Sequence, residues 1–337
     1  MATNNKFLFN KKLNLNPSEL FTQLTQGNIS ALSRAITLVE SNNPNHTKIS
    51  NELISYCNST TSKSLRIGIT GVPGVGKSTF IESFGEIMIK ENKKLAILAI
   101  DPSSQQTGGS ILGDKTRMEE LGKTPNVFIR PSPSGKTLGG VARSTRESIL
   151  LCEAAGFDII LIETVGVGQS ETEVHSMVDF FLLLMLTGAG DELQGIKRGI
   201  MEMADLVVIN KADGNNTIKA KSAQKLLQSA LHYLPPNASN WHVKTLTCSS
   251  LENIGIKQIW ENCLEYQIQM LKNGYLMQNR NSQNKNWFHQ SISQHLQEII
   301  LNKPHIKELI ELKEKQILNG ELSPFLAAEE VSLVFRA

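Results

Sequence analysis

The stretch Gly71-Val72-Pro73-Gly74-Val75-Gly76-Lys77-Ser78 decides the fold of this chain. It matches the pattern GxxxxGK followed by Ser or Thr, and it lies between an apolar run and an amphipathic segment. Glycines let successive backbone N–H groups turn inward around phosphate oxygens, and the N-terminus of the following helix adds partial positive charge. The stretch therefore predicts a phosphate-binding loop between a strand and a helix.

Two side chains of this loop carry chemistry, because Lys77 can reach the β and γ phosphates and the Ser78 hydroxyl can ligate Mg²⁺. A chance glycine-rich turn is the alternative, and both neighbouring elements count against it. A dinucleotide fingerprint fails, because Thr79 stands where GxGxxG, counted from Gly74, needs its last glycine. The predicted nucleotide-binding residues here are Gly71, Val72, Pro73, Gly74, Val75, Gly76, Lys77, Ser78 and Thr79.

Short apolar runs alternate with amphipathic segments around this loop. The runs are Leu65 to Thr70, Leu95 to Ile100, Val127 to Arg130, Ile159 to Glu163, Phe180 to Leu186 and Leu206 to Asn210. This alternation is typical of a parallel sheet with helices on both faces. The predicted fold class is α/β, a P-loop NTPase with a mostly parallel sheet and helical segments at both ends of the chain.

Helical patterns flank the predicted sheet. Asn28 can cap an apolar stripe that predicts a helix over 29–41, a second short helix is expected over 49–56, and no periodicity is seen before about residue 18. Four more helices are expected, over 256–272, 287–301, 306–317 and 323–335. The predicted division is an N-terminal extension (1–63), a nucleotide-binding domain (64–265) and a C-terminal arm (266–337).

Asn210-Lys211-Ala212-Asp213 follows the last apolar run, where strand C-termini of open α/β sheets present ligands. The Asp213 carboxylate can accept two hydrogen bonds from the N1–H and 2-amino groups of guanine, whereas adenine offers no matching pair of donors. A helix-capping aspartate is the alternative interpretation. The position behind a strand and downstream of a phosphate loop favours guanine recognition by Asn210, Lys211 and Asp213.

Three carboxylates follow predicted strands or lie in a glycine-rich stretch between these motifs: Asp101, Asp114 and Glu163. Mg²⁺ prefers oxygen ligands, so these acids together with Ser78 predict a magnesium site, although each acid alone also suits a capping or solvated role. Glu163 begins a DxxG-like stretch in which Gly166 can offer its N–H to a γ-phosphate. Gln169 lies three residues beyond Gly166, so we do not assign it the role of orienting water.

Composition excludes several classes of protein. The 337 residues include 34 Lys and Arg and 32 Asp and Glu, and the net charge of +2 argues against a nucleic-acid partner. The four cysteines form no CxxC pair, and the longest apolar run, Phe180 to Leu186, is too short for a membrane span. The N-terminus lacks an apolar signal region, so we expect a cytoplasmic protein with an unstructured leader.

Longer motifs resemble the MeaB/ArgK GTPases, the accessory G proteins of methylmalonyl-CoA mutase and related adenosylcobalamin-dependent mutases. The resemblance covers roughly residues 20 to 335. It is carried by NISALSRAITLVES from Asn28, GVPGVGKSTFIESFG from Gly71, AIDPSSQQTGGSILGDKTRM from Ala99, RPSPSGKTLGGVAR from Arg130, DIILIETVGVGQSE from Asp158, GAGDELQGIKRGIMEMAD from Gly188 and GELSPFLAAEE from Gly320.

The resemblance implies roles for individual residues. Lys77 and Ser78 would hold phosphate and Mg²⁺, Asp101 and Asp114 would belong to the first switch, and Glu163 would be the Walker-B-type acid. Gly188 to Gly199 would form a further switch that faces the mutase. The candidates for completing hydrolysis are Asp191, Lys197 and Arg198, although a solvated helix start explains the two basic residues equally well.

The resemblance also implies a function and partners: a GTP-binding and GTP-hydrolysing chaperone that gates cofactor loading, protection or reactivation of an acyl-CoA mutase. Its ligands would be GTP, GDP and Mg²⁺, with adenosylcobalamin reached only through the mutase, and its C-terminal helices would form a homodimer. Base-stacking loops of such GTPases usually read Ser-Ala, whereas this chain has Ser249 and Ser250 after Cys248. The nearly isosteric Ser250 is expected to perturb guanine selectivity only slightly.

Two alternative functions stay open. One is an ATP-dependent kinase or transport-coupled ATPase for basic amino acids, a label that this family has also carried; we find no His or Asp pattern that supplies its acceptor base. The other is a metal-insertion GTPase, which should carry a Cys/His cluster near the nucleotide, whereas Cys152 is the only cysteine between Gly71 and Asp213.

Overall fold

The structure is a computed structural model that describes most of the chain. The described residues are 16–41, 43–58, 63–100, 118–131, 138–164, 170–187, 198–233, 238–301 and 303–334. The chain divides into two compact units, residues 1–277 and 278–337, and each is described by itself. The predicted boundaries after residues 63 and 265 stay predictions.

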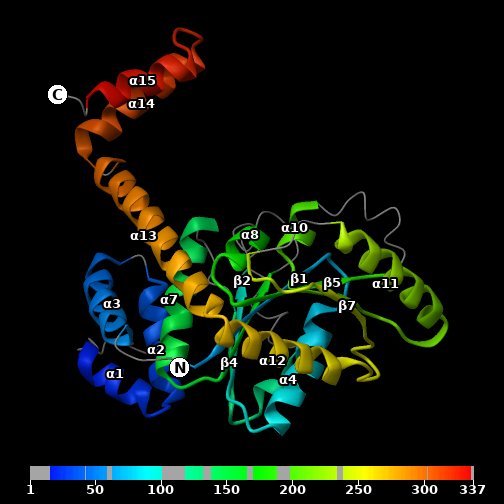
Figure 1. The fold of residues 1–337 in the computed structure, drawn as a ribbon. Helices are drawn as coiled ribbons and strands as arrows, with labels where there is room; N and C mark the ends of the chain where they lie inside the picture. Colours follow the sequence, from blue (N-terminus) through cyan, green and yellow to red (C-terminus); the bar gives the residue numbers. More distant parts are fainter. Residues whose placement is uncertain are drawn as a thin grey trace, which may run out of the picture. The chain divides into compact units, whose positions relative to one another are not determined.

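A seven-stranded parallel sheet organises the first unit (Figure 1). The strand order is β3-β2-β4-β1-β5-β6-β7, so β1 lies at the centre between β4 and β5. The β1, β4, β5 and β6 residues are all buried, as expected for strands covered on both faces. The strands are β1 Leu65–Gly71, β2 Leu95–Ile100, β3 Val127–Arg130, β4 Ile159–Thr164, β5 Phe180–Met185, β6 Leu206–Ile209 and β7 Lys244–Thr247.

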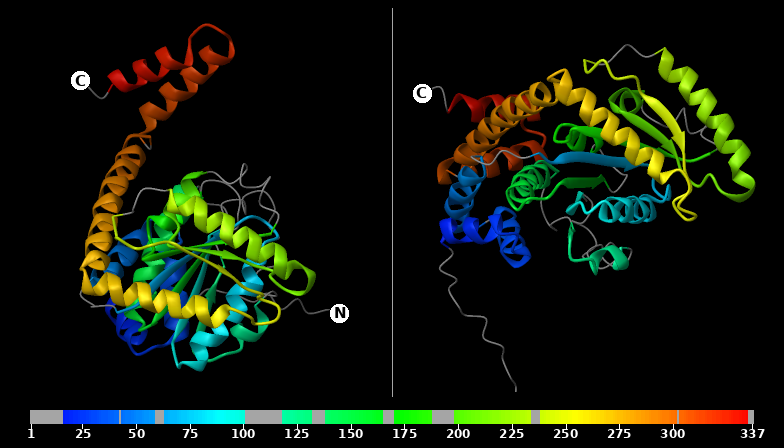
Figure 2. Two further views of the ribbon diagram at one scale, coloured as in Figure 1. Left: turned by 45° about the vertical axis from the view of Figure 1, so that its right-hand side comes forward. Right: turned by 60° about the horizontal axis from the view of Figure 1, so that its bottom comes forward.

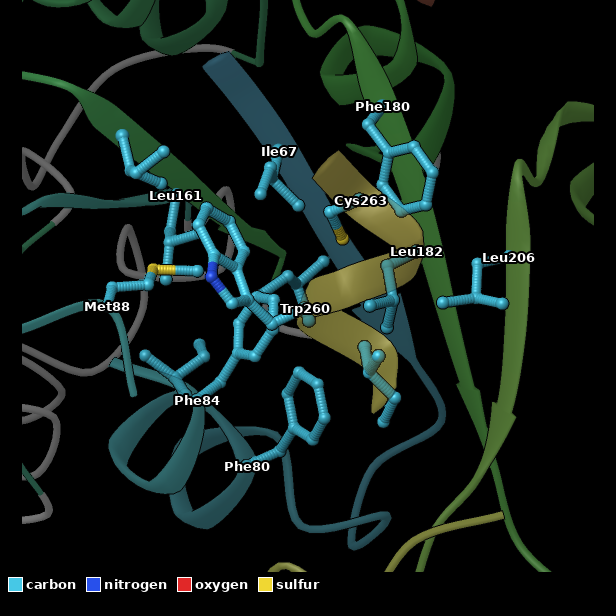
Figure 3. Packing of buried hydrophobic residues seen from close by; sticks show 14 of the residues in the cluster. Ile67, Phe80, Phe84, Met88, Leu161, Phe180, Leu182, Leu206, Trp260 and Cys263 are labelled. Atoms are coloured by element: carbon cyan, nitrogen blue, oxygen red, sulfur yellow. The ribbon is translucent and has the colours of Figure 1, made fainter. Parts of the chain in front are cut away.

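Helices α4 (Lys77–Lys90) and α12 (Ile256–Lys272) pack together over one face of the sheet. Their apolar side chains meet those of the strands in one buried cluster, in which Trp260 lies beside Phe84 with the ring centroids 6.0 Å apart (Figure 3). The Trp260 indole N–H also donates to Glu91, 2.8 Å away, so the buried ring keeps its polar bond. This cluster fixes α4, and therefore the loop before it, against the sheet.

The opposite face is covered by α7 (Leu138–Ala154), α8 (Ser170–His175), α10 (Arg198–Met203) and α11 (Thr217–His232) (Figure 2). Three N-terminal helices pack outside α7: α1 Pro17–Thr25, α2 Ile29–Val39 and α3 Pro44–Cys57. Asn16, Asn28 and Asn43 cap these three helices by accepting backbone N–H bonds. A buried ion pair of Arg66 with Glu153, 2.8 Å, joins β1 to α7.

The outer edge of β7 is occupied by side chains of α11. The Gln228 side-chain oxygen accepts the Thr245 N–H at 3.0 Å, and the Gln224 side-chain amide donates to the Thr245 carbonyl at 2.6 Å. Gln228 also donates to the Val243 carbonyl at 3.3 Å. Since β7 is the last strand of the sheet, these glutamines satisfy backbone groups that a further strand would otherwise pair with.

The second unit is helical. It contains most of α13 (Tyr275–Leu301), together with α14 (Pro304–Leu318) and α15 (Pro324–Leu333). The last two helices pack together, with Ile306 and Ala327 buried and Lys313 paired with Glu330. Several large apolar side chains of this unit are exposed: Phe288, Ile292, Leu296, Ile299, Leu318 and Phe325. Among the helices that the structure describes, none has the length and apolarity to cross a membrane.

The predicted fold class is confirmed, and so are the six predicted strands to within one residue of each end. Several elements differ from prediction. Helix α3 begins at Pro44 and not at 49, because Asn43 caps it and proline is well tolerated at the first helical position. Helix α1 was not expected, because its apolar positions Leu20 and Leu24 are too few to form a stripe. Strand β7 was also missed because its four residues, KTLT, contain a single aliphatic side chain. Helix α13 begins at Tyr275, well before the expected 287.

Two buried aspartates lie at the amino-terminal end of the central strands. Asp179 accepts the N–H of Arg66 at 2.9 Å, and Asp205 accepts the N–H of Phe181 at 2.8 Å. Burial raises the pKa of Asp205 to about 7, and the charge of Asp179 adds to the effect, while the bond from Phe181 opposes it. Asp205 is therefore protonated in the folded state at pH values where the unfolded chain has lost that proton.

We predict that Asp205→Asn weakens the loss of unfolding free energy that occurs as pH rises from about 4 to about 7. Because the folded pKa exceeds the unfolded one, the stability contributed by protonated Asp205 is lost as pH rises through about 7. The asparagine keeps an acceptor for Phe181 without this charge. The slope of unfolding free energy against pH should become less negative by up to about 1.4 kcal/mol per pH unit, measured by urea denaturation between pH 5 and 7.

Asp158→Asn is the matched control, since the exposed Asp158 also accepts a backbone N–H, from Lys94 at 2.8 Å. Its slope should match that of the wild type. An unchanged slope in Asp205→Asn would contradict the assigned titration.

Candidate nucleotide site

The carboxyl ends of the parallel strands bring the predicted motifs to one edge of the sheet. Strand β4 pairs with β1 so that Glu163 lies next to Ile69. Ile69 lies two residues before Gly71, where the phosphate loop begins. Behind these strand ends, the Thr70 and Thr164 hydroxyls share a hydrogen bond of 2.9 Å. The loop after β1 and the buried acid of β4 are thus neighbours, as the sequence predicts.

Glycines give the phosphate loop its shape. A side chain at Gly71 would meet the Leu184 carbonyl oxygen at 2.5 Å, so the loop leaves β1 too close to β5 for any Cβ atom. Gly76 adopts φ 92° and directly precedes α4, a conformation that L side chains rarely adopt. The first backbone N–H groups of a helix lack partners within it, so this turn presents N–H donors and a positive helix end to a phosphate.

Lys77 is buried and folds back onto the loop. Its ammonium donates to the carbonyl oxygens of Gly71 at 2.7 Å and Val72 at 3.3 Å. Burial lowers its pKa, while the charges of Glu163 and Glu171 act in the opposite direction. The ammonium therefore stands inside the loop, where a bound phosphate would supply the negative charge that favours its protonated form.

Asn210 and Lys211 tie the end of β6 to the phosphate loop. The Asn210 side-chain amide donates to the Val75 carbonyl at 2.9 Å, and the Lys211 ammonium donates to the Gly74 carbonyl at 2.8 Å. Lys211 has a positive φ of 57°, which is uncommon for a residue with a side chain. The two bonds hold the NKxD segment and the phosphate loop together, and the structure thus brings these predicted residues together.

Asp213 lies beside the loop that follows β7. The Ser249 hydroxyl donates to the Asp213 carboxylate at 2.7 Å and accepts the Glu252 N–H at 3.1 Å. Ser249 also pairs with Ile254 through an antiparallel bridge, which closes the loop into a tight turn. The carboxylate is half-buried and has one oxygen fixed by Ser249, so the predicted residues Asp213 and Ser249 form one unit.

Two residues at this site were missed in the sequence. The Cys248 thiol contacts the Asn210 side-chain oxygen at 3.3 Å, and the Ser83 hydroxyl donates to the Ser250 carbonyl at 2.7 Å. A single cysteine or serine carries no spacing signal, and Ser83 lies 167 positions from its partner. Only the fold brings these groups together.

The described donors fit Mg²⁺. Ser78 lies in the first turn of α4, and the buried Glu163 lies near the end of β4, so both donors are oxygens of the kind that this ion prefers. No group of three or more His, Cys, Asp or Glu side chains lies together within the described residues. A magnesium ion held by Ser78 and Glu163 would keep several waters and contact the nucleotide phosphates, as Mg²⁺ commonly does.

Several predicted site residues lie outside the part of the chain that the structure describes: Asp101, Asp114, Gly166, Asp191 and Lys197. Arg198 begins α10, but its side chain is also outside the description. The roles given to these residues stay predictions.

Comparisons with known proteins agree with the predicted resemblance. A family model described as methylmalonyl Co-A mutase-associated GTPase MeaB matches residues 32–305. The chain is 45% identical over 323 residues to GTPase ArgK of Escherichia coli (strain K12), covering 94% of this chain and 95% of that protein. It is also 45% identical over 328 residues to the mitochondrial methylmalonic aciduria type A homolog of Mus musculus, covering 94% and 79%.

Among solved structures, the chain is similar to one described as the crystal structure of LAO/AO transport system kinase. The TM-score is 0.75 with 36% sequence identity, and the match covers 96% of this chain and 99% of that one. The chain therefore belongs to the MeaB family and is a P-loop GTPase.

We predict that Asn210→Ala destabilises the protein and weakens nucleotide binding. The substitution removes the donor to Val75 and the acceptor for Cys248 and Ser250, which leaves buried polar groups without these bonds. The expected loss of unfolding free energy is about 2 to 4 kcal/mol, measured by urea denaturation. Asn215→Ala, at an exposed position of the same segment, should change it by less than about 0.5 kcal/mol. Equal losses in the two variants would refute this account.

Proposed function

We propose that this MeaB family member uses GTP binding and hydrolysis to gate adenosylcobalamin loading, protection or reactivation of methylmalonyl-CoA mutase or a related acyl-CoA mutase. The observation that carries the proposal is the match of residues 32–305 to a family model described by its association with that mutase. The similarity to the mouse methylmalonic aciduria type A homolog supports it. The intact phosphate loop and NKxD segment supply the nucleotide chemistry that such a role requires.

In the proposed mechanism, the loop from Gly71 to Ser78 binds the phosphates through its backbone N–H groups and the N-terminus of α4. The Lys77 ammonium exchanges its loop carbonyl partners for β and γ phosphate oxygens and stabilises the charge that develops during hydrolysis. Mg²⁺, when bound, would neutralise phosphate charge beside Ser78 and Glu163. Asp101 and Asp114 are further proposed ligands.

The base is proposed to lie against Asp213, Asn210 and Ser249. The Asp213 carboxylate would accept the guanine N1–H and 2-amino hydrogens, and Ser249 holds one of its oxygens at 2.7 Å. The bonds of Asn210 and Lys211 to Val75 and Gly74 couple this base site to the phosphate loop. The base and the phosphates of a guanine nucleotide would therefore contact two segments, the NKxD segment and the phosphate loop, that are joined by hydrogen bonds.

We propose that two segments of the chain, one at Gly166 and one at 188–199, change conformation with the bound nucleotide and transmit that change to the mutase. Gly166 would sense the γ-phosphate after β4, and Asp191 with Lys197 would complete the hydrolytic site within the complex. A nucleotide can shift the mutase between conformations only by binding differently in the two complexes. Slow hydrolysis by the isolated chain is consistent with this role.

The second unit is proposed to form a homodimer in the cytoplasm. The described part of this unit exposes more large apolar side chains than isolated surface residues would account for. Among them are Phe288, Ile292, Leu296 and Phe325. A second copy would cover them.

A second candidate function comes from the description of the similar solved structure as a LAO/AO transport system kinase. It predicts preference for ATP and phosphoryl transfer to a basic amino acid, whereas the first proposal predicts preference for GTP. A competition assay between the two nucleotides separates them.

We predict that Asp213→Asn loosens guanine preference. The substitution removes one of the two acceptors for the guanine donors, and hydrogen bonds to charged groups contribute about 1.5–3 kcal/mol. The ratio of the dissociation constants for ADP and GDP should fall about tenfold or more, measured by isothermal titration calorimetry. Unchanged discrimination would remove Asp213 from the base site. Asp158→Asn, on the exposed surface, is the control and should leave the ratio unchanged.

The mutase role is tested by mixing the purified chain with adenosylcobalamin-dependent acyl-CoA mutases. We expect a nucleotide-dependent complex, detected by analytical ultracentrifugation, and a change in the GTP hydrolysis rate on mixing. Lys77→Ala should abolish hydrolysis in both conditions because the phosphate charge loses its buried partner. If wild-type protein neither associates with any such mutase nor changes its hydrolysis rate, the proposal fails.

A further inference from the structure

We infer that the hydroxyl groups of Ser83 and Ser250 position the guanine-binding loop against helix α4, and so set the base selectivity of this GTPase. The inference rests on the proposed guanine site. Ser83 acts on that site from α4 and is a positioning residue, whereas Ser250 belongs to the predicted base-binding loop and acts through the bond of its side-chain hydroxyl. Ser83 lies on α4, and Ser250 lies in the loop after β7.

Ser83 provides the contact from α4. Its side chain is buried, and its hydroxyl lies 2.7 Å from the Ser250 carbonyl oxygen and 3.1 Å from the Thr79 carbonyl oxygen of its own helix. A hydroxyl has one proton, and the shorter distance assigns it to Ser250. An alanine at position 83 would leave the buried Ser250 carbonyl without this donor.

Ser250 provides the contact to β6. Its backbone N–H and its hydroxyl both donate to the Asn210 side-chain oxygen, at 3.2 and 2.8 Å. Related loops usually have alanine at this position, and an alanine could supply only the backbone donor. The second bond, from the hydroxyl, therefore exists because this chain has a serine here. The expectation that Ser250 is a nearly neutral replacement therefore misses this bond.

These bonds join into a closed path. Helix α4 contacts Ser250 through Ser83, Ser250 contacts Asn210, and Asn210 donates to Val75 at 2.9 Å in the loop that leads back into α4. Every side chain in the path is buried, where hydrogen bonds are strong and a missing partner is costly. The path holds the loop after β7 in one place relative to the phosphate site before any ligand binds.

The path reaches the base through Ser249, the neighbour of Ser250. Ser249 donates to the Asp213 carboxylate at 2.7 Å, so a displacement of this loop would move the group that is proposed to read guanine. Holding a binding group in its bound geometry raises affinity because less order is lost on binding. Loss of either hydroxyl should therefore weaken guanine binding more than binding of a base that lacks the 2-amino group.

The test compares GDP with IDP, whose base lacks that amino group, by calorimetry on the full-length protein. For Ser83→Ala we expect the dissociation constant for GDP to rise about tenfold and the IDP to GDP ratio to fall about fivefold. Ser250→Ala should lower the ratio about twofold to threefold because its backbone donor remains. Ser83→Cys, which replaces the hydroxyl by a slightly larger and weaker donor, should lie between wild type and Ser83→Ala and covers the case in which Ser83→Ala does not fold.

Ser148→Ala is the matched control. Ser148 is also buried on a helix, and its hydroxyl donates to the Ser144 carbonyl four residues earlier at 2.7 Å. This variant should lower the melting temperature without changing the IDP to GDP ratio. Ser83 and Ser250 variants that behave in the same way would overturn the inference and leave the guanine site intact. A wild-type chain that binds GDP and ADP equally would overturn the guanine site itself, and the inference with it.

Discussion

The structure of the site depends on one buried carboxamide, that of Asn210 at the end of β6. Its nitrogen donates to the Val75 carbonyl, and its oxygen receives the Cys248 thiol and two donors of Ser250. A primary amide can donate and accept at once, which neither a carboxylate nor a hydrocarbon of similar size can do. Because the group is almost fully buried, each of these bonds is made without competition from water.

The sheet makes this arrangement possible. Parallel strands end at a common edge, so β1 and β6 bring the phosphate loop and the NKxD segment to that edge, although Val75 and Asn210 are 135 residues apart in the chain. The aromatic cluster of Phe80, Phe84 and Trp260 fixes α4 below this edge. A densely packed protein core is rigid, so the contacts of these rings hold α4 in one place. The helix therefore presents Lys77 and Ser83 at fixed positions.

The sequence was sufficient for the parts of this protein that depend on local patterns. Apolar runs of four to seven residues located the strands, and the spacing of Gly76, Lys77 and Ser78 located the phosphate loop. It was insufficient where a contact joins distant residues through a single side chain. The sequence around Ser83 or Cys248 does not distinguish these residues from ordinary core residues. Their hydrogen-bond partners are distant in the chain and come close only when α4 and α12 pack against the sheet. Strand β7 is stabilised mainly by β6 and α11, which short-range periodicity cannot reveal.

The two glutamines of α11 along β7 have a consequence for assembly. By occupying the outward N–H and C=O groups of Thr245, Gln224 and Gln228 close the sheet at seven strands. An extended peptide cannot add to this border by main-chain pairing unless both amides first move away. Any protein that approaches from this side must therefore recognise the side chains of α11 or its neighbouring loops. The same two glutamines also protect this edge of the sheet against strand pairing with other copies of the chain, which is how fibril-like aggregates grow.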